Sequence, residues 1–291
     1  MLPEAARGLL LFAAVLAAIL SSAAARAAEN ANPAVSPRGE VAFLSTVGGV
    51  TNIHLIAVDG SRERAVTETP EPKEPPRWSR NGRRIVFGIK VGETTRVVSV
   101  DRSGRYRKTV TTVPGRAARI SPDGTRVLYA TGPWTAVRLF VAKVDGANPV
   151  AVTDGTFVAW NPEWSPDGTT IAYTGRANDR LNIWLVSASG TNPRQLTHIE
   201  SAEGQAQVPA WSPDGRTLAI QVSSKDDGHI WLVDAATGEA HEIAPHATHY
   251  RDEVPAWFPD GKRLAFQSDR TGTMQVWTMN ADGTDQRQLT H

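Results

Sequence analysis

Apolar and polar residues alternate over short stretches of the chain, and the same stretches recur. The segments "TIAYTG" (170–175), "TLAIQV" (217–222) and "RLAFQS" (263–268) alternate with a period of two, which is typical of a β-strand. A second apolar segment follows each of them after a polar loop, as "NIWLVSA" (182–188), "HIWLVDA" (229–235) and "QVWTMNA" (275–281). The pattern predicts an all-β protein built from short strands.

The strands are separated by turn-forming residues in a fixed order. "SPDG" precedes the alternating strand in three places, at 121–124, 165–168 and 212–215. Ser, Pro, Asp and Gly in this order suit the four positions of a type I β-turn, because Pro fixes φ at the second position and Gly is favoured at the fourth. A Gly-bearing turn and a fourth short strand, such as "PRQLTH" (193–198), complete the unit. Each unit therefore has four strands.

Six copies of this unit fill the chain. The glycine that ends the first turn recurs at positions 39, 82, 124, 168, 215 and 261, with spacings of 43, 42, 44, 47 and 46 residues. Four strands repeated at this period are typical of a β-propeller. We therefore predict one six-bladed β-propeller of four-stranded blades over residues 28–291. How the first and sixth blades close the ring is left open.

Tryptophan follows the repeat as well. Seven of the nine tryptophans fall at two repeat positions, which are Trp78, Trp164, Trp211 and Trp257 at one and Trp184, Trp231 and Trp277 at the other. A large side chain that recurs in several blades favours packing between neighbouring sheets over ligand binding.

The first residues differ from the rest. Arg7 precedes an apolar run from Leu9 to Leu20, and Ala25-Arg26-Ala27 offers a small-residue cleavage site. The run is too short to cross a bilayer as a helix, which takes about 20 residues, but it suits a secretory signal peptide. We expect residues 1–27 to be that signal, whose removal would take the net charge from +1 to 0. The chain has no cysteine for disulfides or lipid attachment.

The repeat pattern resembles that of a known family. W-S-P-D-G-x-x-[IL]-A-[YIF], followed by [IV]-W, D-G-T and R-Q-L-T, is similar to the WD40-like PD40 repeat of the TolB β-propeller family. The likeness is sharp in the last three units and weaker in the first three, where Val35 and Ile120 replace Trp. TolB proteins carry an α/β domain ahead of the propeller, whereas here the first repeat begins soon after the expected cleavage site.

The resemblance implies a function. TolB is a periplasmic member of the Tol-Pal system, so we expect a non-catalytic, protein-binding propeller of the cell envelope, with an envelope protein or lipoprotein as its partner. We expect a periplasmic monomer that does not insert into the membrane and does not bind nucleic acid. We expect it to need no cofactor. The chain has no G-x-S-x-G motif, which a peptidase built on such a propeller would need.

One end of the propeller is the expected binding surface. Because every unit has the same strand order, the loops that enter each innermost strand and those that join the second and third strands lie at the same end of the propeller's central channel. Charges of both signs there suit protein recognition. The candidates are Arg176, Asp179, Arg180, Asp226, Asp227, Arg251, Asp252, Asp269 and Arg270.

Histidines raise an alternative. "HEIAPHATHY" (241–250) has the spacing H-E-x-x-x-H, which is one residue too long for a helical zinc-protease motif. His246 and His249 in a loop are nevertheless candidate metal ligands. Oligogalacturonate lyases have a TolB-like propeller that holds a metal with loop histidines, so a metal-dependent polysaccharide lyase is the alternative function. A divalent cation in the channel is a further alternative, given the aspartates of these loops.

Overall fold

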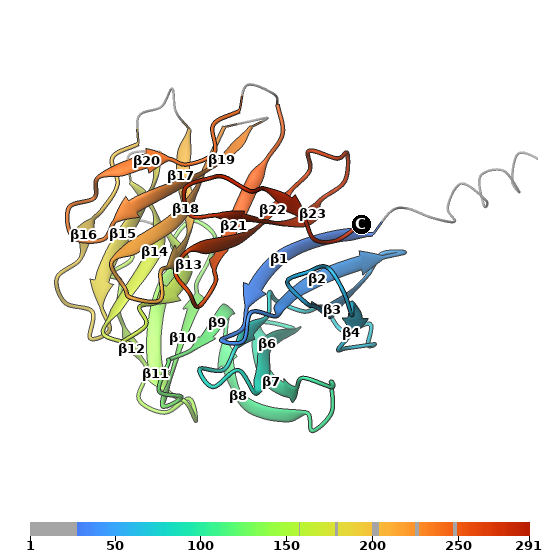
Figure 1. Ribbon diagram of the computed structural model, residues 1–291. Coiled ribbons are helices and arrows are strands. Elements are labelled where there is room, and N and C mark those ends of the chain that lie inside the picture. Colours follow the sequence, from blue (N-terminus) through green and yellow to red (C-terminus); the bar gives the residue numbers. More distant parts are fainter. Residues whose placement is uncertain (1–27, 157, 178–179, 200–203, 225–226, 247–248) are drawn as a thin grey trace, which may run out of the picture.

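The structure is a computed structural model, and it describes residues 28–156, 158–177, 180–199, 204–224, 227–246 and 249–291. In these residues 24 strands form six antiparallel four-stranded sheets, each made from four consecutive strands. The sheets are arranged as the blades of a ring (Figure 1). The predicted all-β, six-bladed propeller is confirmed.

The first three blades have the following strands. Blade 1 holds β1 (Glu29–Val35), β2 (Val41–Val47), β3 (Val50–Ile56) and β4 (Arg64–Ala65). Blade 2 holds β5 (Arg77–Trp78), β6 (Arg84–Val91), β7 (Thr94–Asp101) and β8 (Lys108–Pro114). Blade 3 holds β9 (Arg116–Ile120), β10 (Arg126–Thr131), β11 (Arg138–Lys143) and β12 (Val150–Ala151).

The last three blades follow the same order. Blade 4 holds β13 (Val158–Trp164), β14 (Thr170–Ala177), β15 (Arg180–Ser187) and β16 (Arg194–Gln195). Blade 5 holds β17 (Gln205–Trp211), β18 (Thr217–Ser223), β19 (Gly228–Asp234) and β20 (Ala240–Glu242). Blade 6 holds β21 (Asp252–Trp257), β22 (Arg263–Ser268), β23 (Gln275–Asn280) and β24 (Arg287–Gln288).

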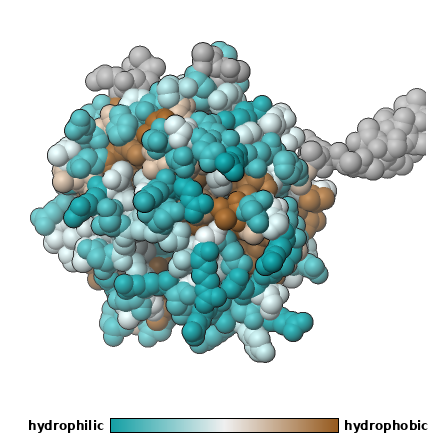
Figure 2. Space-filling view, viewed as in Figure 1, coloured by the Kyte–Doolittle hydropathy of each residue, from teal (hydrophilic) through white to brown (hydrophobic). Residues whose placement is uncertain are grey.

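The hydrophobic core is divided among the spaces between blades. Alternate residues of one strand face opposite sides of the sheet, so that Ile171 and Tyr173 of β14 pack toward blade 3 while Ala172 packs toward blade 5. Six such clusters are present in the described chain, one between each pair of neighbouring blades. Hydrophilic groups cover most of the face seen in Figure 2. Stability therefore depends on blade-to-blade packing.

The ring closes by the same packing, without a strand exchanged between the ends. β1 lies beside blade 6 (Figure 1), where Phe43 and Phe258 share one buried cluster. Asn30 donates its backbone N–H to the Met274 carbonyl at 2.8 Å. Asn32 donates its backbone N–H to Gln267 Oε1 at 2.9 Å. This answers the question of closure that the sequence left open.

A bulge in the innermost strand makes such links available. Asn32, Ala117, Asn161, Val208 and Val254 occupy the same bulge in five blades with positive φ, between 48° and 56°. Their backbone N–H groups are turned away from their own sheet, and most donate to a side chain of the preceding blade or its loop. Thr174 Oγ1 accepts from Val208, and Gln221 Oε1 from Val254. Blade 6 meets blade 1 through the same contact.

The repeated turns and tryptophans also serve the fold. In every unit the turn glycine donates its N–H to the carbonyl three residues earlier, as Gly168 does to Ser165 at 2.8 Å, which confirms the predicted turn. Trp78, Trp164 and Trp257 donate Nε1–H to backbone carbonyls of the preceding blade at 3.0 to 3.2 Å. The predicted packing role of this tryptophan position is confirmed.

Residues 1–27, the expected signal peptide, lie outside the described residues. In the part of the chain that is described, no helix is long and apolar enough to span a bilayer.

Candidate functional site

Charged residues of blades 4, 5 and 6 gather at the loop end of the ring, opposite the Ser-Pro-Asp-Gly turns. Of the nine residues predicted to form the binding mouth, Asp179 and Asp226 lie outside the described residues. The other seven lie at strand ends or in the adjoining loops: Arg176, Arg180, Asp227, Arg251, Asp252, Asp269 and Arg270. We call this part of the molecule the loop face.

Arg251 and Asp269 join two loops of the loop face. Asp269 Oδ1 accepts the backbone N–H of Arg251 at 2.7 Å, and its Oδ2 accepts the guanidinium Nε–H at 2.9 Å. The side-chain hydrogen bond to Asp269 raises the pKa of Arg251 above its usual value. Arg251 remains exposed. The pair therefore offers a partner both signs of charge at one place.

Asp252 and Arg270 form a more buried pair. Asp252 is only 1% exposed, and its Oδ2 accepts a hydrogen bond from Arg270 Nη2. The Arg270 guanidinium also lies over the rings of Tyr250 and Trp277, at 4.7 and 4.6 Å from their centroids. Asp252 thus orients Arg270 from within the protein, although sequence reasoning placed both residues at the surface.

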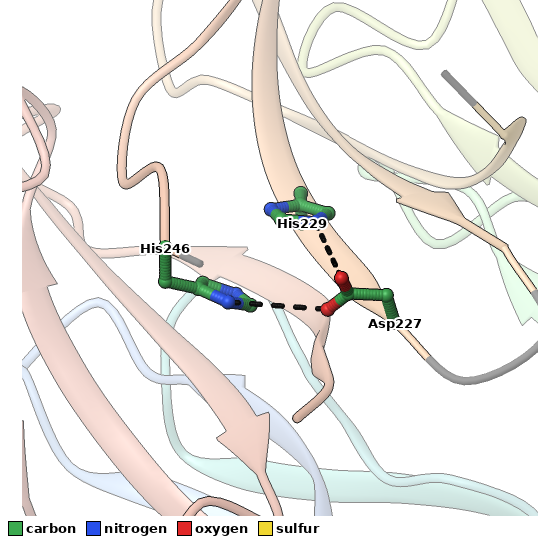
Figure 3. Close-up of side chains that lie close together, drawn as sticks. All are labelled: Asp227, His229 and His246. Atoms are coloured by element: carbon green, nitrogen blue, oxygen red, sulfur yellow. Dashed lines mark ion pairs between the residues drawn. The ribbon is translucent and has the colours of Figure 1, made fainter. Parts of the chain in front are cut away.

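A cluster of three candidate ligands lies at the edge of blade 5. Asp227 ends the loop before β19, His229 is in β19, and His246 comes from the loop that leads to β21 (Figure 3). Asp227 Oδ2 is 3.5 Å from His229 Nε2, and Asp227 Oδ1 is 3.9 Å from His246 Nδ1. One ligand atom from each residue lies within 4.8 Å of the others. This spacing suits a metal ion.

The cluster differs in part from the predicted pair of His246 and His249. His246 belongs to it, whereas His249 is 82% exposed and reaches it only through Nδ1, 3.6 Å from Asp227 Oδ2. His229 was missed because it lies in the strand motif "HIWLVDA", where it looked like part of the repeat. Aligning it with Asn182 and Gln275 at the same repeat position would have shown it as a departure.

Neighbouring groups fix the two imidazole rings. His246 stacks between His229, at a centroid distance of 4.3 Å, and Tyr250, at 3.7 Å. Glu242 Oε1 lies 2.6 Å from His229 Nδ1, and the Gly228 carbonyl lies 3.3 Å from His246 Nε2. Burial raises the pKa of Tyr250, so its hydroxyl stays neutral. The site is therefore held by both blade 5 and the loop to blade 6.

The opposite end of the ring holds a cavity that sequence reasoning did not find. Its volume is about 950 Å³, and it is lined by the turn prolines and by Trp78, Trp164 and Trp257. Glu163 Oε2 lies 3.3 Å from Arg77 Nε and 3.7 Å from Arg119 Nε. Burial, with the nearby positive charge of Arg77, lowers the pKa of Arg119 to about 10. The basic side chains that line this cavity outnumber the acidic ones, so it suits a cation less well than the cluster at blade 5 does.

Comparison with known proteins gives both a family and a fold. Residues 123–291, more than half of the chain, match the family model described as the TolB beta propeller domain. A solved structure described as TolB from Agrobacterium tumefaciens is similar, with 23% identity and a TM-score of 0.69 over 82% of this chain and 87% of that one.

Two other solved structures share the fold. TolB from Acinetobacter baumannii is 17% identical with a TM-score of 0.68, and the match covers 89% of this chain and 62% of that one. An oligogalacturonate lyase in complex with manganese is 17% identical with a TM-score of 0.59, over 91% of this chain and 78% of that one. At these identities the similar structures show the fold alone.

Proposed function

Because this chain belongs to the TolB β-propeller family, we propose that it is a non-catalytic propeller that binds a protein of the bacterial cell envelope. The observation that supports this most is the loop face, where paired charges of both signs lie at the ends of β21 and β22. Mixed charge of this kind gives specificity and a fast association rate to protein recognition.

The location follows from the same proposal. We place the protein in the periplasm, because residues 1–27 have the sequence pattern of a secretory signal. Its partner is then an envelope protein, and a lipoprotein fits best with the known setting of the family.

A charge-reversal experiment tests the binding surface. Arg176 and Arg251 are exposed at the loop face, and Arg38 and Arg216 are exposed at the turn end. The immobilised protein is used to capture partners from detergent-solubilised envelope extract, and the captured protein is then purified and titrated against it. We expect one-to-one binding that is lost in R176E/R251E and kept in R38E/R216E, which carries the same change of charge.

Two results would overturn the proposal. Binding that survives R176E/R251E would move the site away from the loop face. Failure of the purified envelope protein to bind the wild-type chain would remove the protein-binding function itself. Circular dichroism of each variant establishes that the fold is intact in the comparison.

The cluster of Asp227, His229 and His246 favours a second candidate, a metal-dependent lyase acting on an acidic polysaccharide. The similar fold of an oligogalacturonate lyase is consistent with it. The test is to incubate the metal-loaded protein with oligogalacturonate and follow the ultraviolet absorbance of an unsaturated product. A rise in absorbance that is absent in D227N would establish the lyase, and a flat trace would reject this substrate.

A further inference from the structure

The hydrogen-bond partners of the two rings determine which nitrogen of each histidine faces Asp227. A backbone carbonyl can only accept, so the Gly228 oxygen places a proton on His246 Nε2, and Nδ1 is the ring nitrogen that faces Asp227. Glu242 lies 2.6 Å from His229 Nδ1, and although the contact is poorly aligned for a hydrogen bond, its charge favours a proton on Nδ1. His229 Nε2 then presents its lone pair to Asp227.

With these tautomers, neither His229 nor His246 gives Asp227 a hydrogen-bond donor. Asp227 carries a carboxylate toward two imidazole lone pairs, and its Oδ1 is buried without a hydrogen-bond partner among the described residues. An unpaired buried carboxylate oxygen is unfavourable, because it has lost its hydration without gaining a donor. A cation between the three groups would remove that penalty. Carboxylate–histidine contacts behind the ligands, like that of Glu242, are the usual support of metal-bound imidazoles.

The positions equivalent to His229 and Ala244 in blades 4 and 6 form a hydrogen-bond network instead. In blade 4, Asn182 Oδ1 accepts from Thr197 Oγ1 at 2.9 Å, and in blade 6, Gln275 Oε1 accepts from Thr290 Oγ1 at 2.7 Å. Each threonine also accepts the backbone N–H of the next strand residue, Ile183 or Val276, at 2.9 Å. These neutral networks tie the loop that follows the blade to its third strand.

Blade 5 has lost that network at three positions together. His229 stands where blades 4 and 6 have Asn182 and Gln275, and Ala244 stands where they have Thr197 and Thr290. Glu242 replaces the glutamines Gln195 and Gln288, which there donate to the threonine carbonyls. The three new residues are the ones that build the cluster or clear space beside it.

We propose that Asp227, His229 and His246 bind one divalent transition-metal ion. Two imidazoles and one carboxylate suit Zn²⁺, Mn²⁺ or Fe²⁺, whereas Ca²⁺ and Mg²⁺ prefer oxygen ligands alone. Ligand atoms around a tetrahedral Zn²⁺ with bonds of about 2.0 to 2.1 Å are about 3.3 Å apart. The observed 3.5 and 3.9 Å, and the limit of 4.8 Å that holds for all three ligand atoms, require an inward movement. The two rings, now stacked at an angle of 17°, must also tilt so that both nitrogens point at the ion. The fourth position is left to water or to His249.

Isothermal titration of metal-free protein with Zn²⁺ tests this proposal, which is independent of the protein-binding function. We expect one ion per chain, and no binding of Mg²⁺ under the same conditions. The E242Q variant keeps all three ligands but loses the charge behind His229, and is expected to bind Zn²⁺ about 10- to 100-fold more weakly. H229N/A244T restores the pattern of blade 4 and is expected to lose the ion altogether.

The matched control is H241A, which removes an exposed histidine on the same strand as Glu242. It is expected to bind Zn²⁺ as the wild type does. D227N serves as a second ligand variant in a loop, in case H229N/A244T folds poorly. The proposal is overturned if the wild type binds no Zn²⁺, if D227N binds as tightly as the wild type, or if H241A loses binding to the same extent as D227N.

Discussion

The two ends of the propeller differ in how closely the blades agree with one another. At the turn end every blade makes the same backbone hydrogen bond from the turn glycine. In blades 2 to 5 the turn serine also donates its hydroxyl to the Asp or Asn two residues later. At the loop face, blades 4 and 6 share an amide–threonine network, whereas blade 5 has His229 and Ala244 instead. Contacts that repeat in every blade hold the ring together. Blades 2 and 3 also lack the amide and have Arg96 and Arg138 there, whereas in blade 5 the replacement His229 belongs to a cluster of candidate ligands.

The largest effect is expected where the repeated network is cut. In T197A, the backbone N–H of Ile183 loses its acceptor and Asn182 loses one donor, both in a buried setting. An unsatisfied buried group costs about 1 to 3 kcal/mol, so the free energy of unfolding should fall by about 2 to 3 kcal/mol. Urea unfolding measures it.

The control for that change is T191A, which removes an exposed hydroxyl in the turn after β15. It should alter stability by less than about 0.5 kcal/mol. If T197A is as mild as T191A, the network does not hold blade 4, and its absence from blade 5 would carry no meaning.

A smaller effect is expected at the bulge. Val254 has a φ of 51°, which is strained for a β-branched residue, whereas Asn32 and Asn161 occupy the same bulge in blades 1 and 4. V254N should therefore raise the free energy of unfolding by about 0.5 to 1 kcal/mol. The reverse change N161V should lower it by a similar amount. Equal and opposite shifts would show that the bulge is interchangeable between blades, and a destabilised V254N would contradict this.

The smallest effect concerns pH at the turn end. Hydrogen bonds from Ser121 Oγ and from the Thr125 N–H lower the pKa of Asp123 to about 2, from an ordinary value of 3.8. Since the folded pKa is the lower one, the unfolded chain takes up the proton first, and this stabilisation is present above about pH 4 and lost as the pH falls toward 2.

Blade 2 supplies the matched variant for that effect. Asn81 occupies the place of Asp123 and accepts the same two hydrogen bonds without titrating. D123N should therefore be slightly less stable than the wild type at pH 7, where Asp123 is ionised, and show a weaker loss of stability between pH 4 and pH 2. Thermal unfolding across that range measures it, and identical pH profiles would rule out the contribution of Asp123.

Most of the fold could be predicted because the same structural unit occurs six times in the sequence. The alternating strands and the turn residues recur in every unit, so a weak local signal becomes a strong one by repetition. The closure of the ring could not be predicted, since Asn32 meets Gln267 only when blades far apart in sequence come together. The same holds for Glu163, which contacts Arg77 and Arg119 from other blades.

The site was predicted only in part for a related reason. His246 stood out because it lies in a loop rich in histidines, but the partnership of His229 with Glu242 depends on the pairing of β19 with β20. Asp252 appeared to be a surface charge because its loop is polar, although the end of β22 and Arg270 bury it. Loop position in a sequence indicates the end of the ring, but not which side chains turn inward.

Blade 5 has a candidate metal-binding site where blades 4 and 6 have the amide–threonine network. The most direct test is urea unfolding of metal-free H229N/A244T beside the wild type, followed by the same measurement with Zn²⁺. A restored network adds at least one net hydrogen bond, worth about 0.5 to 1.5 kcal/mol, so the variant should be more stable without metal. Zn²⁺ should then stabilise only the wild type. A variant that is less stable without metal, or equally stabilised by Zn²⁺, would contradict the claim.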